Sequence, residues 1–298
     1  MPPVNHNSSE ATDFDSLWNY SDPEATETKF REILPQIKES GNISEYLQLL
    51  TQIARTLGLR RKFEDSHKLL DEVETQLNDA LPKAKVRYLL ERGRTFNSSG
   101  KIPEARELFL QAYNLAVSEK EDNLAVDAAH MMGIVESGEK SVEWNEKAME
   151  LAEASSDSKA NGWLGSLHNN LGWTYFEMKQ YDKALNLFKK DAVWYTEKGR
   201  TENTNIACWS AAKTLRVMGK TEEALEEQLR LLELYRKGEA DEDGYVYEEL
   251  AECYLIKNNA AEASKYAGLA YDILSKDIWM EANEKDRLNR LKELGGRQ

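Results

Sequence analysis

The histidines and cysteines are the residues of this chain best suited to chemistry, and there are few of them. They are His6, His67, His130, His168, Cys208 and Cys253. Asp127 and His130 are three positions apart, which places both on one face of a helix, where they could hold a metal ion together. Two ligands make a weak metal site, so a packing or solvated role is the preferred interpretation of this pair. Cysteines inside apolar helical patterns act as small buried hydrophobes, and we expect neither a disulfide nor a thiolate metal site.

Motifs that are typical of catalysis are absent from the sequence. It contains no phosphate-binding glycine loop, no Cys-x-x-Cys, no His-Glu-x-x-His and no nucleophile elbow. The sequence therefore predicts a protein that is not an enzyme and that has no catalytic residues, no metal and no cofactor.

The net charge and the lack of long apolar segments limit the kinds of partner that the protein can bind. The 298 residues carry a net charge of −14, which disfavours binding to nucleic acid or to an anionic membrane surface. No segment approaches the roughly 18 apolar residues of a membrane span, and residues 1–10 do not resemble a signal peptide. We expect a cytoplasmic protein that contacts neither membrane nor nucleic acid.

A pair of helices recurs along the chain and would position the remaining polar and aromatic residues. The clearest unit is residues 168–188, with Gly172 and Tyr175 in a first helix and Ala184 and Phe188 in a second. Small residues recur in the second helices at Ser66, Ala105, Ser141, Ala184, Ala224 and Ala263, spaced by 36 to 43 residues. A second series recurs in the first helices at Ala54, Gly93, Ala129, Gly172, Ala212 and Ala251. Small side chains let two helix axes approach closely, so both series indicate helix crossings.

The unit at 168–188 resembles the tetratricopeptide repeat, whose pattern places Leu-Gly and Tyr in one helix and Ala and Phe in the next. The resemblance implies an all-α fold, a right-handed superhelical solenoid of antiparallel helix pairs with about six repeats and capping helices. The period exceeds the usual ~34 residues, as in relatives of the kinesin light chain type. The third unit fits least well, because Gly133 and Gly138 are poor helix formers and Asn145 replaces the aromatic residue.

The expected organisation has four parts and no internal linker. They are a disordered tail at 1–15, an N-terminal capping segment and helix at 16–43, repeats at 44–276, and a C-terminal capping helix at 277–298. Asp22 and Asp182 are predicted helix N-caps, because a carboxylate there accepts from free backbone amides, and a final helix is expected after Asp277. Leu17, Trp18 and Tyr20 are expected to pack on the first face of the array.

Ligands of the resembled family usually lie on the first helices, along a concave groove. The residue after each small first-helix position is Arg55, Arg94, His130, Trp173, Lys213 or Glu252. The predicted peptide-binding residues are Arg55, Arg87, Arg94, His130, Asn169, Asn170, Trp173, Trp209, Lys213 and Arg216. Arg94 and Trp173 are expected to be largely exposed. In the alternative interpretation the arginines pair with acids such as Glu91 and Asp127, and the tryptophans pack between repeats.

The sequence favours a protein–protein interaction module, an adaptor, scaffold or regulator that binds a peptide in the groove. Basic and aromatic groups together suit an acidic segment with an apolar anchor. Two alternatives stay open: a structural repeat protein that self-associates into a homo-oligomer, and a small-molecule sensor with a pocket inside the superhelix.

Overall fold

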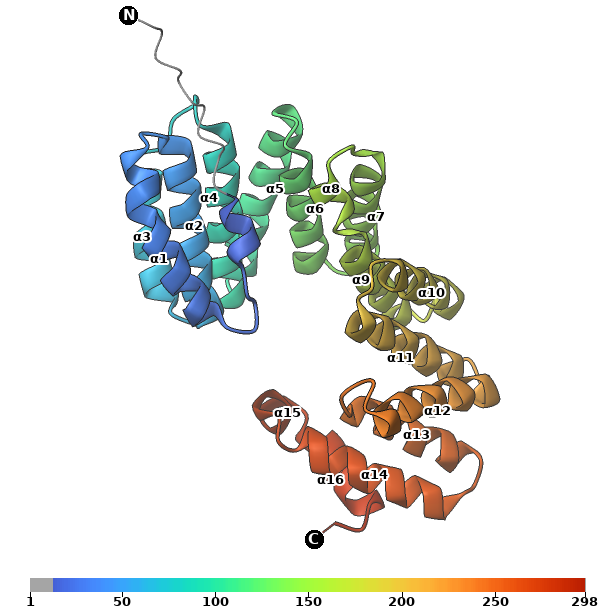
Figure 1. The fold of residues 1–298 in the computed structure, drawn as a ribbon. Coiled ribbons are helices and arrows are strands. Elements are labelled where there is room, and N and C mark those ends of the chain that lie inside the picture. Colours follow the sequence, from blue (N-terminus) through green and yellow to red (C-terminus); the bar gives the residue numbers. More distant parts are fainter. Residues whose placement is uncertain (1–12, 298) are drawn as a thin grey trace, which may run out of the picture. The chain divides into compact units, whose positions relative to one another are not determined.

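The computed structural model describes residues 13–297, and every regular element in that range is a helix (Figure 1). Twelve of the helices form six pairs, each joined by a turn of three residues, so the two helices of a pair run antiparallel. The first helices are α2 (Ile43–Leu59), α4 (Pro82–Ser98), α6 (Asp122–Val135), α9 (Leu164–Glu177), α11 (Thr201–Val217) and α13 (Gly244–Ile256). The second helices are α3 (Phe63–Glu74), α5 (Ile102–Ser118), α7 (Glu139–Ala154), α10 (Tyr181–Glu197), α12 (Thr221–Lys237) and α14 (Ala260–Leu274).

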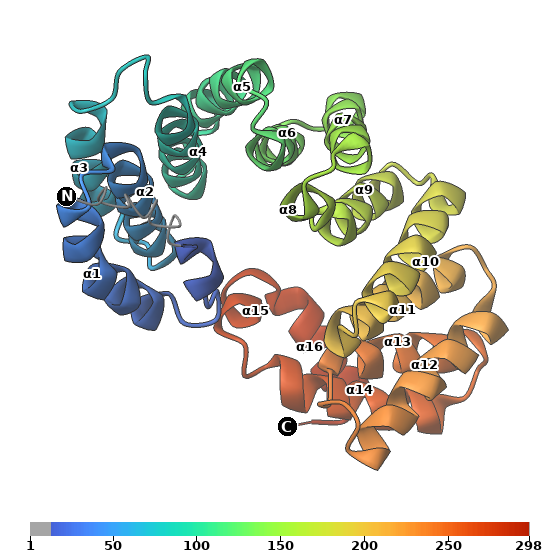
Figure 2. The ribbon, with the colours of Figure 1, turned by 45° about the horizontal axis from the view of Figure 1, so that its top comes forward.

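The chain divides into two units, which meet at Trp163 and Leu164. The sequence had indicated one array without a boundary. In unit 1, the pairs from α2 to α7 follow the 3-10 helix η1 (Phe14–Leu17) and α1 (Pro23–Glu39), and α8 (Ser158–Asn161) closes the unit. Figure 2 shows α2, α4 and α6 in one row and α3, α5 and α7 in another. The core of unit 1 is continuous and includes the fully buried side chains of Phe30, Leu47 and Phe109.

Unit 2 contains the pairs from α9 to α14, followed by α15 (Ile278–Asn283) and α16 (Lys285–Leu294). Helix α16 packs on α14 and buries Leu288 and Leu291 against it. The contact is close because two glycines meet there: a methyl group at Gly295 would lie 2.5 Å from the backbone of Gly268.

Outside the third pair, the small-residue positions lie at helix crossings, as the sequence predicts. All twelve are buried. A methyl group built on Gly93 would lie 2.5 Å from the ring of Phe109, and one built on Gly172 would lie 2.6 Å from the ring of Phe188. The glycine is therefore required at both crossings, because a phenylalanine ring fills the space of its missing side chain.

Five of the six pairs share one turn, and the third pair does not. The shared turn has a residue in the left-handed region at Arg61, Gly100, Lys179, Gly219 and Asn258. The amide after that residue donates to a carbonyl five positions back, as Gln180 does to Tyr175 at 2.9 Å, which closes the end of the first helix. The third pair has extended Glu136 and left-handed Gly138 in its place.

Because its connection differs, the third pair crosses about four residues further along its first helix than the other pairs do. Ser66 donates to the carbonyl of Ala54 at 2.9 Å in the first pair, whereas Ser141 donates to the carbonyl of Gly133 at 2.7 Å. The sequence pattern assigned that contact to Ala129, four residues earlier. Asn145 fills the space above Gly133 and donates to the carbonyl of Ser141 at 2.8 Å. The missing side chain of Gly133 therefore leaves the space that the side chain of Asn145 occupies.

Residues 1–12 of the expected disordered tail lie outside the described residues. Of the remaining tail residues, Asp13 precedes η1, and Phe14 and Asp15 belong to it. The side chain of Phe14 is buried in the core of unit 1. In residues 13–297, no helix has the length and apolar character needed to cross a membrane.

Candidate functional site

The ten predicted site residues are divided between the two units. We call the surface formed by α2, α4 and α6 the unit 1 face. It carries Arg55, Arg87, Arg94 and His130. The unit 2 face, on α9, α11 and α13, carries Asn169, Asn170, Trp173, Trp209, Lys213 and Arg216. The two faces differ in chemistry.

A relay of ion pairs crosses the unit 1 face from helix to helix. Glu91 on α4 accepts from Arg55 on α2 at 3.4 Å and from Arg94 on its own helix at 2.7 Å, and Arg94 also pairs with Asp127 on α6. Burial alone would raise the pKa of Asp127, but the nearby guanidinium groups of Arg94 and Arg55 hold that pKa below its usual value. The prediction that Arg94 is largely exposed is wrong, because its side chain is only 14% exposed and both of its partners are buried.

His130 ends this relay as a buried, neutral side chain. Burial lowers the pKa of His130 to about 4, although the carboxylate of Asp127 acts in the opposite direction. Its ring centre lies 5.4 Å from that of Trp163. Within residues 13–297, no three histidine, cysteine or acidic side chains gather as a metal site would require. Burial also raises the pKa of the Cys208 thiol to about 11 and that of Cys253 to about 12, so both are protonated at neutral pH.

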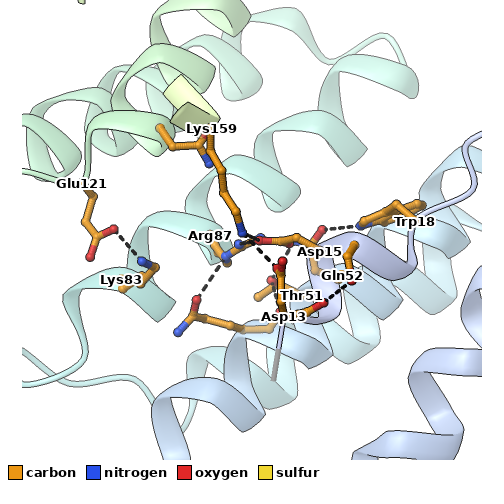
Figure 3. Close-up of polar contacts among 12 residues, drawn as sticks. Asp13, Asp15, Trp18, Thr51, Gln52, Lys83, Arg87, Glu121 and Lys159 are labelled. Atoms are coloured by element: carbon orange, nitrogen blue, oxygen red, sulfur yellow. Dashed lines mark hydrogen bonds and ion pairs between the residues drawn. The ribbon is translucent and has the colours of Figure 1, made fainter. Parts of the chain in front are cut away.

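The N-terminal segment, residues 13–20, lies across the unit 1 face (Figure 3). Asp15 accepts from Arg87 at 2.5 Å, and Asp13 accepts from Lys159 of α8 at 2.9 Å. The indole of Trp18 donates to Gln52 at 3.0 Å, while the guanidinium of Arg55 lies over the Trp18 ring, 5.5 Å from its centre. The sequence predicted that Leu17, Trp18 and Tyr20 pack on the array; Leu17 and Trp18 are partly buried, whereas Tyr20 is 59% exposed. The sequence did not predict that the two aspartates bind cations of α4 and α8.

A cavity of about 340 Å³ opens beside the N-terminal segment. Its charged lining residues are Asp13, Asp15, Glu45, Lys83, Arg87, Glu121, Asp157 and Lys159. Lys83 and Glu121, which pair with each other at 2.7 Å, form its far side in Figure 3. The cavity thus extends the surface on which the N-terminal segment lies.

The unit 2 face presents a row of aromatic rings, one from each first helix. The ring centres of Trp173 and Trp209 are 5.7 Å apart, and those of Trp209 and Tyr245 are 5.6 Å apart. Trp209 also donates its indole N–H to the carbonyl of Tyr245 at 3.0 Å. All three rings are partly exposed. Trp173 packs against Phe188 as well, with ring centres 5.1 Å apart, so the inner edge of the row continues into the core.

Two cations lie on the unit 2 face, and one buried acid holds both. Lys213 lies over the Trp209 ring, 5.1 Å from its centre, and pairs with Glu249 at 3.1 Å. Arg216 binds the same carboxylate through two nitrogens, at 2.5 and 3.0 Å. Burial alone would raise the pKa of Glu249, but Arg216 and Lys213 hold it below its usual value. Two cations facing one carboxylate leave this part of the face with net positive charge.

Asn169 and Asn170 lie at the edge of the unit 2 face on α9. Asn169 donates to the side chain of Asn170 at 3.3 Å. The side-chain oxygen of Asn169 is buried and has no hydrogen-bond partner among the described residues. The neighbouring His168 is 7% exposed, and burial lowers its pKa to about 4, which agrees with the packing role predicted for it.

Comparison with known proteins identifies the repeat. Residues 168–193 match the family model described as tetratricopeptide repeat. No curated protein matches the sequence of the chain. Among solved structures, the apo form of RapI is similar with a TM-score of 0.70 at 13% identity, over 89% of this chain and 75% of RapI.

Two further proteins share the fold. The apo quorum sensor NprR from B. thuringiensis has a TM-score of 0.67 at 15% identity, over 96% of this chain and 81% of NprR. NprR in complex with its cognate peptide NprX gives 0.55 at 17% identity, over 94% of this chain and 81% of that one. The TPR-like repeats of a kinesin light chain-type protein from Podosopora anserina also give 0.55 at 17%, over 66% of this chain and 97% of theirs. The chain therefore has the all-helical, TPR-like fold of these proteins, built from antiparallel helix pairs, and one of these pairs matches the tetratricopeptide repeat itself.

Proposed function

We propose that the chain is a protein-interaction module, an adaptor, scaffold or regulator, that binds a peptide segment on the unit 2 face. The observation that carries this proposal is the row of Trp173, Trp209 and Tyr245, whose partly exposed rings come from three successive first helices. Tryptophan, tyrosine and arginine dominate the binding energy of protein interfaces, because they bury much apolar area at small entropic cost. The peptide complex of NprR, a protein of the same fold, supports a ligand of this kind.

The chemistry of the face indicates the chemistry of the peptide. The aromatic row suits an apolar side chain as anchor, and the excess positive charge of Lys213 and Arg216 over Glu249 suits a carboxylate beside it. Asn169 and Asn170 would contact the backbone of the peptide. Glu249 does not oppose an acidic ligand, because its side chain is 2% exposed and paired with both cations.

Selection from a phage-displayed random peptide library on the full chain tests this function. Affinities of the selected peptides are then measured for wild type, for Trp209→Ala and for the control Trp279→Ala, which removes a 58% exposed tryptophan of α15. We expect Trp209→Ala to weaken binding at least about tenfold, or ~1.4 kcal/mol, and the control to leave it unchanged. Selected peptides that bind Trp209→Ala and Trp173→Ala like wild type, with unchanged helical circular dichroism, would place the peptide site elsewhere.

Self-association is a second candidate function, favoured by two apolar side chains of α15. Ile278 and Trp279 follow one another in the chain, and their exposed fractions are 83% and 58%. Light scattering of the wild type and of Ile278→Asp at several concentrations separates the two functions. A mass that falls to that of one chain in the variant supports self-association, whereas a wild-type monomer at all concentrations argues against it.

A further inference from the structure

We propose that residues 13–20 are an internal ligand of the unit 1 face, and that this face accepts partner segments of the same chemistry when the internal one is displaced. The matching chemistry is an aromatic residue between two carboxylates, followed within one or two turns by a second aromatic residue. This inference concerns the unit 1 face alone and does not depend on the peptide site proposed for the unit 2 face.

The N-terminal segment is held on α2, α4 and α8 by its side chains, as a bound peptide would be, and its backbone also bonds to α1, where the amide of Asn19 donates to the Thr26 hydroxyl at 3.0 Å. Its only regular structure is one 3-10 turn, in which the amides of Ser16 and Trp18 donate to the carbonyls of Asp13 and Asp15. Every polar contact named above between this segment and α2, α4 or α8 is made by a side chain of the segment. A partner that supplies the same side chains can therefore replace it without breaking a helix of the repeats.

Two of these contacts match a charge on the segment with a cation on the repeats. Arg87 is buried, with its side chain 10% exposed, and it binds Asp15 while also donating to Gln48 at 3.1 Å. A guanidinium buried in this way needs an acceptor, because an unpaired buried charge is costly. Lys159 of α8 binds Asp13 and lies 3.9 Å from Asp15, so it adds a more exposed positive charge to the same site.

Aromatic contacts supply the apolar part of the recognition. Phe14 is 5% exposed and meets Phe30 of α1 edge to face, with ring centres 6.5 Å apart. Trp18 meets the same ring edge to face at 5.4 Å and stacks on Tyr20 at 4.7 Å. Phe30 itself is fully buried. The N-terminal segment therefore has two anchors in one apolar site, and its aspartates lie where Arg87 and Lys159 can reach them.

The surface is larger than the segment that covers it. The cavity of about 340 Å³ continues from Arg87 and Lys159 to the pair formed by Lys83 and Glu121. A partner segment has room there for further polar contacts that the internal segment does not make. Displacement is then favourable for a longer peptide, although the internal segment competes at the millimolar effective concentration typical of a short tether.

Binding of the segment in trans provides the test. A fluorescein-labelled peptide with the sequence of residues 13–22 is titrated with full-length wild type and with the variant Asp13→Lys/Asp15→Lys, and anisotropy is recorded. In the variant the internal segment is repelled by Arg87 and Lys159, so the face is open. We expect it to bind the labelled peptide at least about tenfold more tightly than wild type does.

Two controls separate recognition from general charge attraction. Glu32→Lys/Glu39→Lys makes the same change in net charge on exposed positions of α1 and should bind the peptide no better than wild type. A peptide with lysine at both aspartate positions should not bind the opened variant. Equal binding of the first peptide by wild type and by an opened variant with unchanged helical content would overturn the proposal. So would an equal gain in the Glu32→Lys/Glu39→Lys control.

A second measurement applies if the opened variant does not fold. Lys159→Glu changes a side chain that is 52% exposed, so the helix pairs should remain intact. It places like charge beside Asp13 and Asp15, and the amides of Ser16 and Trp18 should exchange with deuterium faster than in wild type. Unchanged exchange at these two amides would show that the ionic contacts do not hold the segment on the unit 1 face.

Discussion

Gly172 is the position where one added methyl group gives the sharpest test of the fold. The methyl group of Gly172→Ala would lie 2.6, 2.9 and 3.0 Å from three ring carbons of Phe188, whereas ordinary contacts are 3.4 to 4 Å. The ring cannot move aside freely, because Phe188 is fully buried and Trp173 packs on it. Gly172→Ala therefore forces the two helices of the α9/α10 pair apart.

The expected loss follows from two opposing contributions. Alanine favours a helix over glycine by about 1 kcal/mol. Overpacking of a close-packed site costs about 1–3 kcal/mol, and the rigid surroundings of Phe188 place this site at the upper end. The free energy of unfolding should therefore fall by up to about 2 kcal/mol, which lowers the melting temperature by on the order of 5 °C. Gly172→Leu, with a larger side chain, should cost on the order of 2–4 kcal/mol.

Gly58→Ala is the matched control. Gly58 lies in α2, and a methyl group there would meet Thr95 at 3.6 Å and Ser66 at 3.9 Å, both ordinary contacts. Only the helix-propensity gain remains, so this variant should be as stable as wild type or more stable by up to about 1 kcal/mol. Urea unfolding followed by far-ultraviolet circular dichroism measures both variants. A Gly172→Ala protein at least as stable as Gly58→Ala would refute the assigned crossing.

Three further predictions concern pH and local stability. Burial raises the pKa of Asp191 to about 7, so the folded chain keeps a proton that the unfolded chain releases above about pH 4. The stability of the fold should therefore fall as the pH rises toward 7. Melting curves at pH 5 and pH 8 measure this fall, which Asp191→Ala should remove. Burial lowers the pKa of His130 to about 4, so the stability of the fold should fall as the pH drops below 6.5. The fall should be less steep in His130→Gln, and equal slopes of stability against pH in the variant and the wild type would contradict this. Amides of residues 122–155 should exchange faster than those of neighbouring pairs in hydrogen-exchange mass spectrometry, because the third pair lacks the closing turn.

Helix ends show how far local spacing carries a prediction. Asp22 caps its helix as expected and accepts from the amide of Ala25 at 3.0 Å, and a helix begins after Asp277 as predicted, with Asp277 accepting from the amide of Trp279 at 2.7 Å. Asp182 does not cap α10, which begins at Tyr181 after a turn that the left-handed Lys179 sets. A short polar residue signals a nearby helix start, but the turn before the helix decides which residue begins it.

The sequence offered Glu91 and Asp127 as partners of the arginines in its alternative interpretation, and the structure confirms both acids, but the sequence did not assign which arginine meets which acid. Arg55, Arg94 and Arg216 each meet an acid on the following first helix, 33 to 36 residues along the chain. Many acids lie at similar distances in sequence, and only packed helices select one of them. The same limit applies to Asp13 and Lys159, which are 146 residues apart.

The sequence by itself determined the repeated helix pair, its crossings outside the third pair and the all-helical class, because close approach of two helices requires small residues at a fixed spacing in the chain. Tertiary structure alone decided which acid each site arginine meets, that Asp13 and Asp15 bind cations of α4 and α8, and that the third pair crosses at Gly133. These features depend on contacts between residues that are distant in the chain. Burial, partner choice and register of such contacts follow from how whole helices pack, which no local pattern of residue types encodes.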